Sequence, residues 1–386
     1  MILKNAKVVN DQFQFEFSDI QIKDGKIQKI SENLSGEDER DFSGLTIIPG
    51  LFDIHTHECV GHQLCDCTQD TLQEMALYYA KNGTTSYLAT LDSQDKETLY
   101  SVCRELGTFQ KTYHDGAIMQ GVHLEGLFFN EKRKGGHPAE LLLPPDVELV
   151  HKLDELCGKT IRMVCVAPEI DGAEGFIKAL ANEMVVSIAH TDATMSQAKA
   201  GVRWGAKNFT HLFNGMRGFT HREPGTVGGA FDSPSTFKEI IADGMHLNPA
   251  TVRMAVKIVG PDKLIFVSDS CVATGLEDGV YSIGSKVKRK IEVKNQLAHL
   301  EGTDTICGST YCLYKMFKNA VQNIGIDFIT ALKACTINPA SLVGLDHQIG
   351  SIANGKSADL IVIDNDLNIV QVYVRGEEQV LNHTVS

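Results

Sequence analysis

Histidines and carboxylic acids recur through the middle of this chain, each close to the end of a short apolar run. In chain order they are His55, His57, His123, Glu125, Glu169, His190, Asp192, His211, Asn214 (an amide among them), Asp243, His246 and Asp269. Imidazole nitrogens and carboxylate oxygens are the ligands that zinc, iron and manganese take in proteins. The pattern therefore indicates a metal site assembled from several separate segments.

Each of these residues also has an ordinary structural explanation when it is taken alone. A single histidine at a strand end is more often a hydrogen-bonded structural residue than a ligand. Asp269 could cap the segment that follows it, and Glu125 could pair with a neighbouring lysine. Those separate explanations would all have to place their residue at the end of an apolar run. The joint pattern therefore favours a metal site.

The apolar runs alternate with stretches of helical spacing, which predicts repeated strand–helix units. We expect strands at 52–55, 85–89, 118–124, 162–166, 185–189, 208–211, 239–242 and 264–267. Eight such units favour an α/β fold with a closed, TIM-like (β/α)8 barrel. An open doubly wound sheet is the alternative, but no GxGxxG turn follows an early strand. In a barrel the carboxyl ends of all strands share one face, which would bring the ligand-type residues together.

Both ends of the chain have short β-rich stretches instead, with turn signals such as Asp24-Gly25 and Arg375-Gly376. We expect strands there at Ile2–Val9, Phe13–Phe17, Ile20–Lys23, Lys26–Ile30, Leu360–Ile363, Val370–Val374 and Gln379–Leu381. Neither end is long enough for a core of its own. We expect residues 1–48 and 346–386 to form one small sheet domain together, around a barrel domain at 49–345. Within the barrel part, residues 275–305 look like a strand-rich insertion after the eighth run.

Composition excludes several classes of protein. The 386 residues include 36 Lys and Arg against 49 Asp and Glu, a net charge of −13. This balance disfavours nucleic acids and acidic membranes as partners. No apolar run is long enough for a membrane span, and the first residues do not resemble a signal peptide, so we expect a cytoplasmic protein. The ten cysteines include no CxxC pair and suit reduced thiols; Cys65 and Cys67 are a weaker candidate pair for a soft metal.

Several blocks of the chain resemble the N-acetylglucosamine-6-phosphate deacetylases of the amidohydrolase superfamily. The resemblance runs from Pro49-Gly50-Leu51-Phe52-Asp53-Ile54-His55-Thr56-His57 through Gly121-Val122-His123-Leu124-Glu125-Gly126 and His190-Thr191-Asp192-Ala193-Thr194 to Thr210-His211-Leu212-Phe213-Asn214-Gly215-Met216, His221-Arg222-Glu223-Pro224-Gly225 and Ala242-Asp243-Gly244-Met245-His246. It implies the same barrel with a small β-sandwich. It also implies metal-dependent removal of an N-acetyl group from N-acetyl-D-glucosamine 6-phosphate, in amino-sugar catabolism.

The resemblance also implies a role for particular residues. Glu125, His190 and His211 would hold one divalent ion, and His55 and His57 are where some members bind a second. Zinc is the first expectation, with iron, manganese or cobalt as alternatives. Asp269 would be the catalytic acid and base. The residues expected to line the substrate are Gly136, His137, Asn214, Gly215, Arg222, Asp243, His246, Ile306, Cys307 and Gly308.

In the family, the arginine that corresponds to Arg222 enters the neighbouring subunit's site, so a homodimer is implied; taken alone, Arg222 would pair with Glu223 at the surface. The chain departs from the usual pattern at Glu58, Leu127, Gly215 and Ser270. Two other functions stay open. One is deacetylation of N-acetylgalactosamine 6-phosphate or another N-acyl substrate, and the other is a catalytically silent binding protein on the same fold.

Overall fold

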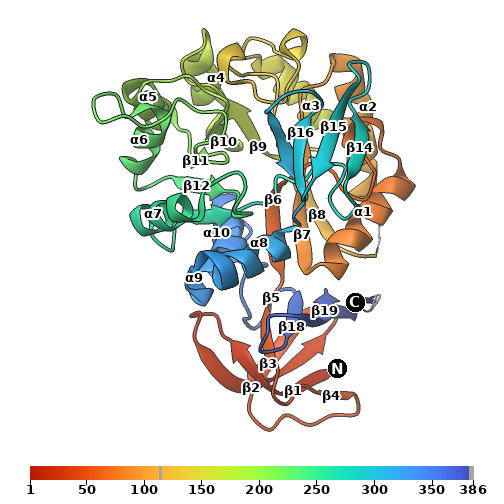
Figure 1. Cartoon of the computed structure of the whole chain (residues 1–386). Helices are drawn as coiled ribbons and strands as arrows, with labels where there is room; N and C mark the ends of the chain where they lie inside the picture. The colour runs from red at the N-terminus through yellow and green to blue at the C-terminus, as the bar shows by residue number, and fades with distance from the viewer. Residues whose placement is uncertain (113–114, 382–386) are drawn as a thin grey trace.

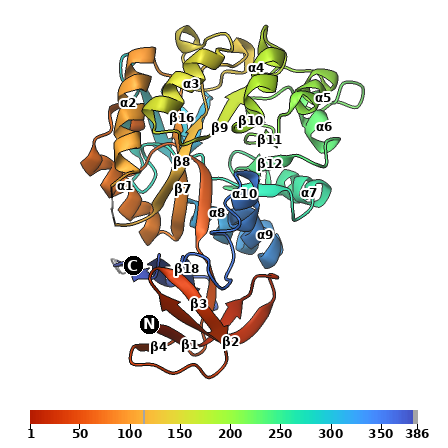
Figure 2. The same cartoon turned by 180° about the vertical axis from the view of Figure 1, so that it is seen from behind.

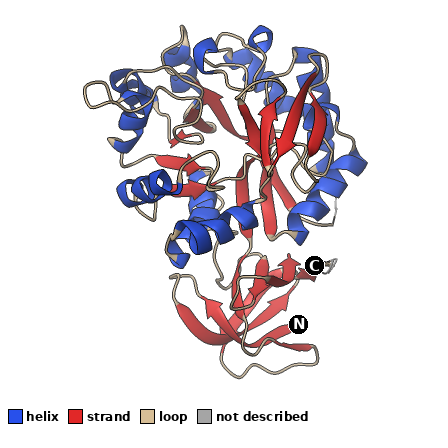
Figure 3. Ribbon diagram, in the orientation of Figure 1, coloured by secondary structure: helices blue, strands red, loops and turns tan. Residues whose placement is uncertain are grey.

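A barrel of parallel strands forms the larger part of the molecule (Figures 1 and 3). The computed structural model describes residues 1–112 and 115–381. Its eight barrel strands pair in chain order. They are β6 (Leu51–Thr56), β7 (Thr84–Leu91), β8 (Ile118–Leu124), β9 (Ile161–Val166), β10 (Val185–Ile188), β11 (Asn208–Phe209), β12 (Phe237–Ile240) and β13 (Leu264–Phe266). The ring closes where Asp269 N–H donates to the His55 carbonyl at 2.9 Å. The predicted barrel and all eight of its strands are confirmed.

Helices connect the barrel strands and cover the outside of the barrel. They are α1 (Gln69–Lys81), α2 (Lys96–Phe109), α3 (Val147–Leu156), α4 (Ala173–Leu180), α5 (Met195–Trp204), α6 (Gly225–Phe231), α7 (Pro249–Val259), α8 (Leu313–Asn319), α9 (Phe328–Cys335) and α10 (Ile337–Leu342), with short turns of helix at Leu64–Asp66, Glu131–Arg133, Ala139–Leu141 and Ala320–Ile324. Local sequence fixes several starts: Thr68 and Thr194 form capping boxes, and Asp95 caps α2. None of the described helices is long and apolar enough to cross a membrane.

A second sheet combines strands from both ends of the chain and lies beside the barrel (Figures 1 and 2). It contains β1 (Ile2–Val9), β2 (Phe15–Lys23), β3 (Lys26–Ser31), β4 (Glu39–Asp41), β5 (Thr46–Pro49), β18 (Leu360–Ile363), β19 (Ile369–Val374) and β20 (Glu377–Glu378). The central pairing joins β5 to β18, with Pro49 opposite Leu360. Residues such as Leu3, Ile20 and Tyr373 give this sheet an apolar core of its own.

Two details of the terminal strands differ from the sequence expectation. Phe13–Phe17 and Ile20–Lys23 were expected as separate strands, but β2 runs through both from Phe15, because its pairing with β1 continues on both sides of a register shift between Leu3 and Ala6. Gln379–Leu381 was expected as a strand, whereas the last one is β20. The division of the chain at residues 48/49 and 345/346 stays a prediction, and residues 382–386 of the C-terminal range lie outside the described part of the chain.

The expected insertion after the eighth run is a four-stranded antiparallel sheet. Its strands are β14 (Gly279–Ile283), β15 (Arg289–Lys294), β16 (Leu297–Leu300) and β17 (Ile306–Ser309). The sheet is fixed to the barrel through the bridge between Ser270 and Ser309. It therefore begins and ends next to the carboxyl end of β13, and one of its faces can wall the mouth of the barrel.

Candidate active site

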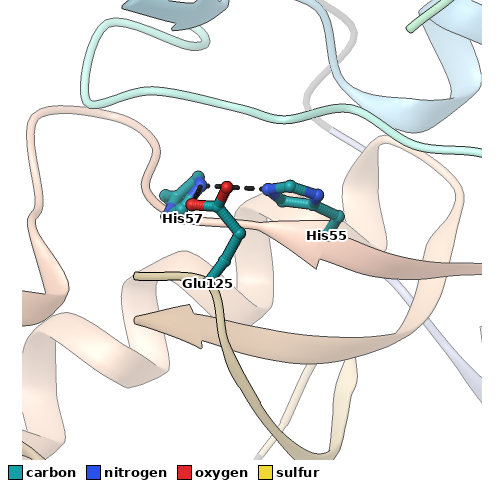
Figure 4. Close-up of side chains that lie close together, drawn as sticks. All are labelled: His55, His57 and Glu125. Atoms are coloured by element: carbon teal, nitrogen blue, oxygen red, sulfur yellow. Dashed lines mark hydrogen bonds and ion pairs between the residues drawn. The ribbon is translucent and has the colours of Figure 1, made fainter. Parts of the chain in front are cut away.

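Two groups of ligand-type side chains share Glu125, which follows strand β8. His55, His57 and Glu125 form one group, and Glu125, His190 and His211 form the other. Within each group the candidate ligand atoms all lie within 4.8 Å of one another. Figure 4 shows the carboxylate of Glu125 reaching from its own segment toward the rings of His55 and His57. The barrel thus brings together side chains from β6, β8 and the segments after β10 and β11.

The distances inside the two groups are those of atoms that converge on a shared centre. Glu125 Oε1 lies 3.0 Å from His190 Nε2 and 3.3 Å from His211 Nε2. The Nε2 atoms of His55 and His57 are 3.1 Å apart, and those of His190 and His211 are also 3.1 Å apart. Two neutral imidazoles cannot both direct lone pairs at one another without a proton or a cation between them.

Hydrogen bonds on the far side of the rings decide which nitrogen faces the centre. The Nδ1 atom of His57 lies 3.0 Å from the Thr90 carbonyl, and Nδ1 of His190 lies 2.7 Å from the Arg133 carbonyl. A carbonyl can only accept, so each Nδ1 carries a proton and each Nε2 is the nitrogen that faces the centre. The Nδ1 atom of His211 has no partner among the described residues.

His55 is held in the same way by a carboxylate that sequence analysis did not assign to the site. Glu239 on β12 is completely buried, and its Oε2 lies 3.1 Å from His55 Nδ1. The same carboxylate accepts the backbone N–H of His211 at 3.3 Å and the Asn208 side-chain amide at 2.5 Å. A charged residue inside an apolar strand was the available signal, because buried charges need partners.

Asp269 stands beside this cluster. Its Oδ1 lies 3.4 Å from His55 Nε2 and 3.3 Å from His57 Nε2. Burial raises the pKa of Asp269, but the charge of His55 and the hydrogen bond from His57 outweigh that effect and hold the pKa below its ordinary value. The negative charges around His55 have the opposite effect on its imidazole. Burial lowers the pKa of His55, but Asp269 and Glu239 outweigh burial and raise that pKa to about 10. The site is therefore strongly attractive to cations.

Three of the clustered residues have strained backbones. His190, His211 and Asp269 have φ angles of 42°, 31° and 48°, in the left-handed region that non-glycine residues rarely adopt. Each such residue costs on the order of 1–3 kcal/mol, and such conformations concentrate at functional sites. In all three cases the unusual φ comes just beyond a barrel strand, where the chain turns and its side chain joins the cluster.

A cavity of about 360 Å³ opens above the cluster, a size that suits a small ligand. Of the residues predicted for metal and proton transfer, His57, Glu125, His190, His211 and Asp269 line it. The predicted substrate residues that line it are Gly136, His137, Asn214, Gly215, His246, Ile306, Cys307 and Gly308. His55 and Asp243 lie behind this wall, and Arg222 is exposed and does not line the cavity of its own chain. Arg222 has no ion pair with Glu223, whose carboxylate instead accepts from the backbone N–H groups of Met195 and Gly225.

Two lining histidines are positioned by neighbours of their own. His137 places Nε2 3.2 Å from Glu125 Oε2, while its Nδ1 lies 3.0 Å from Ser93 Oγ. His246 bonds through Nδ1 to Asp243 at 2.6 Å, and Asp243 also accepts from Ser309 Oγ at 3.2 Å. Asp243 therefore reaches the cavity only through the imidazole that it orients.

Gly215 has a steric reason to be glycine. Its φ is +58°, and a Cβ there would lie 2.6 Å from His190 Nδ1. Any side chain would push His190 away from the Arg133 carbonyl that holds it. This departure from the sequence pattern of related deacetylases therefore accommodates the close approach of the loop to His190.

Some residues at the same strand ends do not join the cluster. His123 is buried between the Ile54 carbonyl, 3.0 Å from its Nδ1, and the Cys165 thiol. Glu169 accepts from the Thr191 hydroxyl and the Asp192 backbone, and Asp192 pairs with Arg133 and Arg217. The candidate pair Cys65 and Cys67 is buried and forms no metal-type group among the described residues.

The donor set fits one or two divalent ions. Glu125 presents one oxygen to His190 and His211 and the other toward His57, so a carboxylate could bridge two cations. The facing Nε2 pairs and the carbonyl-fixed Nδ1 atoms of His57 and His190 are features of a site whose central atom is a cation. Nitrogen and oxygen donors of this kind suit a first-row transition metal.

Comparison with known proteins agrees with this geometry. The Amidohydrolase family model matches residues 46–378. N-acetylglucosamine-6-phosphate deacetylase from Lysinibacillus sphaericus is 31% identical over 98% of both chains. N-acetylgalactosamine-6-phosphate deacetylase from Escherichia coli O157:H7 is 28% identical over 97% of this chain and 98% of its own.

The solved structures point the same way. N-acetyl-D-glucosamine-6-phosphate deacetylase from Mycobacterium smegmatis superimposes with a TM-score of 0.91, 31% identity, and coverage of 98% of this chain and 99% of that one. Its fold and the family match together support the barrel with a terminal β-sandwich and a metal-dependent hydrolase. The chain therefore belongs to the amidohydrolase family.

Proposed function

We propose that this protein hydrolyses the N-acetyl group of N-acetyl-D-glucosamine 6-phosphate, giving D-glucosamine 6-phosphate and acetate. The observation that carries the proposal is the position of Asp269, 3.3–3.4 Å from two histidines of a cation-binding cluster and open to a cavity of ligand size. Relatives from Lysinibacillus sphaericus and Mycobacterium smegmatis that carry this activity in their names support it.

Glu125, His190 and His211 would hold the principal divalent ion, and His55 and His57 would hold a second with Glu125 between the two. Zinc is our first choice, because its borderline character suits a mixed set of nitrogen and oxygen ligands; iron, manganese and cobalt are alternatives. When bound, such an ion polarises an amide carbonyl and lowers the pKa of water to roughly 7.

Asp269 is well placed to move the proton that amide hydrolysis requires. An amine is a poor leaving group until it is protonated, so one side chain must take a proton from water and deliver it to nitrogen. The ionised state that its surroundings favour is the state that can accept the proton. His137, which lines the cavity beside Glu125, would orient the acyl oxygen.

The rest of the cavity would hold the sugar phosphate. His246, fixed by Asp243, can hydrogen-bond a ring hydroxyl. Gly136, Asn214, Gly215 and the segment Ile306–Gly308 contribute backbone and amide groups around the opening. A charged sugar phosphate does not cross membranes, so we place the enzyme in the cytoplasm.

We further propose a homodimer in which Arg222 enters the neighbouring subunit's site. The side chain is exposed, has no ion pair among the described residues and belongs to a loop between Gly215 and α6. An arginine delivered across a two-fold interface would make each site depend on assembly. Arg222→Ala should then raise KM for the phosphorylated sugar more than it lowers kcat. Mixing it with Asp269→Asn should restore activity in hybrid dimers; no rescue after proven subunit exchange would contradict the shared site.

The decisive experiment measures acetate release from N-acetyl-D-glucosamine 6-phosphate before and after treatment with a chelator. Turnover that chelation abolishes and added metal restores is the expected result. Turnover that survives complete removal of metal would contradict a metal-dependent mechanism. A metal-replete protein that releases no acetate from any N-acyl sugar would favour the catalytically silent binding protein instead.

N-acetylgalactosamine 6-phosphate is the second candidate substrate. The 28% identical relative from Escherichia coli O157:H7 is named for that activity and matches almost the whole chain. The two sugars differ only in the configuration of one hydroxyl group, so one hydrogen bond in the cavity could decide between them. A paired assay of kcat/KM for the two sugar phosphates distinguishes the candidates.

A further inference from the structure

An arginine of the inserted sheet reaches the mouth of the barrel. Arg289 is the first residue of β15, where it pairs with Ile283 of β14. Its side chain lines the cavity, and its Nη1 donates to the carbonyl of Gly136, which also lines it. The positive charge also lies close enough to Cys307 to lower that thiol's pKa, although burial raises it to about 12 overall. The inserted sheet therefore places a cation directly at the cavity wall.

Arg289 is incompletely bonded in this position. Its Nε is buried and has no hydrogen-bond partner in the described structure. A buried donor without an acceptor is unfavourable, and a guanidinium presents its five N–H donors in a planar fork suited to phosphate. A small movement toward an incoming oxyanion would satisfy this donor.

The charge of the cavity makes this one side chain important. Five carboxylates line it: Glu58, Asp92, Glu125, Asp269 and Asp304. Metal ions would offset Glu125 and Asp269. Burial and the charge of Asp92 raise the pKa of Glu58 well above its ordinary value, so Asp92 and Asp304 are the two negative charges that remain outside the candidate metal groups. Among the described residues that line the cavity, Arg289 is the only lysine or arginine. A phosphate group entering this cavity would otherwise meet mainly negative side chains.

Arg289 also lies on the side of the cavity where the polar backbone groups gather. A Cβ on Gly135 would lie 3.1 Å from His190 Cε1, and a Cβ on Gly215 would lie 3.0 Å from the same atom. The segment that Arg289 contacts and the Asn214-Gly215 segment therefore flank one edge of His190. An anion bound by the amides near Gly215 would be within the neighbourhood of the Arg289 side chain.

We propose that Arg289 is a specificity-determining residue that binds the substrate's phosphate group from within the same chain. The inference rests on the proposed function, since it assigns a partner to the phosphate of that substrate. It is distinct from the role of Arg222, which would act from the other subunit. The insertion would then serve as part of the binding site, and selection for a phosphorylated sugar would not depend on assembly alone.

The test compares Arg289→Ala with wild type on N-acetyl-D-glucosamine 6-phosphate and on unphosphorylated N-acetyl-D-glucosamine. We expect kcat/KM for the phosphorylated sugar to fall by about tenfold to a hundredfold, the range of charge-assisted hydrogen bonds. The value for the unphosphorylated sugar should change by less than about threefold, since a charge-assisted bond absent from that complex has nothing to lose. Arg289→Lys should recover part of the loss.

Lys290→Ala is the matched control, because it removes one positive charge from the neighbouring, exposed position of the same strand. It should leave both kcat/KM values unchanged. An equal fall with both sugars in Arg289→Ala would show that the arginine only positions the Gly136 segment, and would overturn the proposal. Unchanged selectivity would overturn it as well.

A binding measurement separates failure of this inference from failure of the proposed function. Calorimetric titration of the metal-loaded protein with D-glucose 6-phosphate, and with glucose as the neutral control, needs no turnover. Weaker binding of the phosphate ester to Arg289→Ala than to wild type or Lys290→Ala supports the anion site even if no acetate is released from any substrate. Equal binding of the ester to all three proteins rules out the anion site whatever the activity.

Discussion

Two buried polar regions of this protein differ in one respect. Lys238 on β12 is 1% exposed, and its ammonium group donates to the carbonyls of Ser233 at 2.6 Å and Thr236 at 2.7 Å. Most ligand-type side chains at the mouth of the barrel are buried too, yet imidazole nitrogens there face one another at 3.1 Å. The lysine has its acceptors within the protein, whereas the imidazoles at the mouth converge without satisfying one another.

This difference separates buried polar residues that stabilise the fold from those that bind a ligand. Burial of charge is common to both regions, so burial cannot be the criterion. Groups that satisfy one another contribute to folding, and groups that converge without satisfying one another await a ligand. Mutations in the two regions should therefore have different effects. Variants at the mouth of the barrel should lose metal and turnover, whereas variants at Lys238 should lose stability.

The largest effect is expected from removing a ligand of the principal ion. His190→Ala or His211→Ala should lose that ion and with it most of the rate enhancement, at least about 10⁴-fold. Elemental analysis and the acetate assay measure the two losses. His151→Ala, at an exposed histidine paired with Glu183 at 2.9 Å, is the control and should retain full metal content. Full occupancy in both ligand variants would remove them from the metal site.

Asp269→Asn should lower kcat by about 10²–10⁴-fold while metal content is unchanged. The amide keeps the shape of the side chain but cannot accept the proton from water at neutral pH. Stopped assays of acetate release, run alongside elemental analysis, test both halves of the statement. Near-normal kcat would show that another group carries the proton. Asp269 would then be a structural residue, as Lys238 is expected to be.

Glu239→Gln should have an intermediate effect through His55. The neutral amide accepts a weaker hydrogen bond from Nδ1, so His55 becomes a poorer ligand and affinity for the second ion should fall by roughly 10–100-fold. Metal titration of the apoprotein reports this directly. Glu292→Gln, at an exposed position of β15, should bind metal like wild type. If all three proteins gave identical metal titrations, the hydrogen bonds of Glu239 would only stabilise the fold, as those of Lys238 do.

The smallest effect is expected at Lys238. Lys238→Met leaves a carbonyl without its donor and should cost about 1–3 kcal/mol of unfolding free energy. Metal content and kcat should stay at wild-type values. Thermal unfolding and the acetate assay test the pair of statements. If Lys238→Met lost turnover but kept its stability, Lys238 would have a role in the reaction, and the distinction between the two regions would be wrong.

The pH dependence of unfolding gives a finer test of Lys238. Burial, helped by the charge of Lys263, lowers its pKa to about 8 from an ordinary value of 10.5. Between these two values the unfolded chain binds more protons, so this residue makes wild type more stable as pH rises from about 8 to 10.5. Lys238→Met should lose that rise. The difference in unfolding free energy between wild type and variant should therefore widen over this interval.

The sequence predicted the barrel because each strand carries its own apolar, β-branched composition. It also predicted most of the site, because parallel topology brings residues such as His57, Glu125 and Asp269 to the same ends of their strands. Glu239 could not be assigned, since its partner His55 lies on β6, 184 residues away in the chain. Arg289 could not be assigned either, because only the path of the inserted sheet brings it over the cavity.

Several helices also escaped prediction, for a physical reason. Helix α6 has the sequence Gly-Thr-Val-Gly-Gly-Ala-Phe, which has poor helix propensity. It forms because it packs tightly: a Cβ on Gly228 would lie 2.1 Å from the side chain of Pro224, and one on Gly229 would lie 2.7 Å from that of Ala198. Helices α8 and α10 have seven and six residues, fewer than two turns, which is too short for a periodic pattern to be recognised.

The terminal sheet has a consequence for the order in which the protein is made. Strand β5 is synthesised early, but its neighbour β18 follows only after the entire barrel, since Pro49 pairs with Leu360. At about 5–20 residues per second the ribosome needs roughly 15–60 seconds to cover that interval. Throughout it, β5 presents an unpaired edge that another chain could pair with. Chaperone capture of nascent chains should therefore peak before β18 emerges and decline once it has paired.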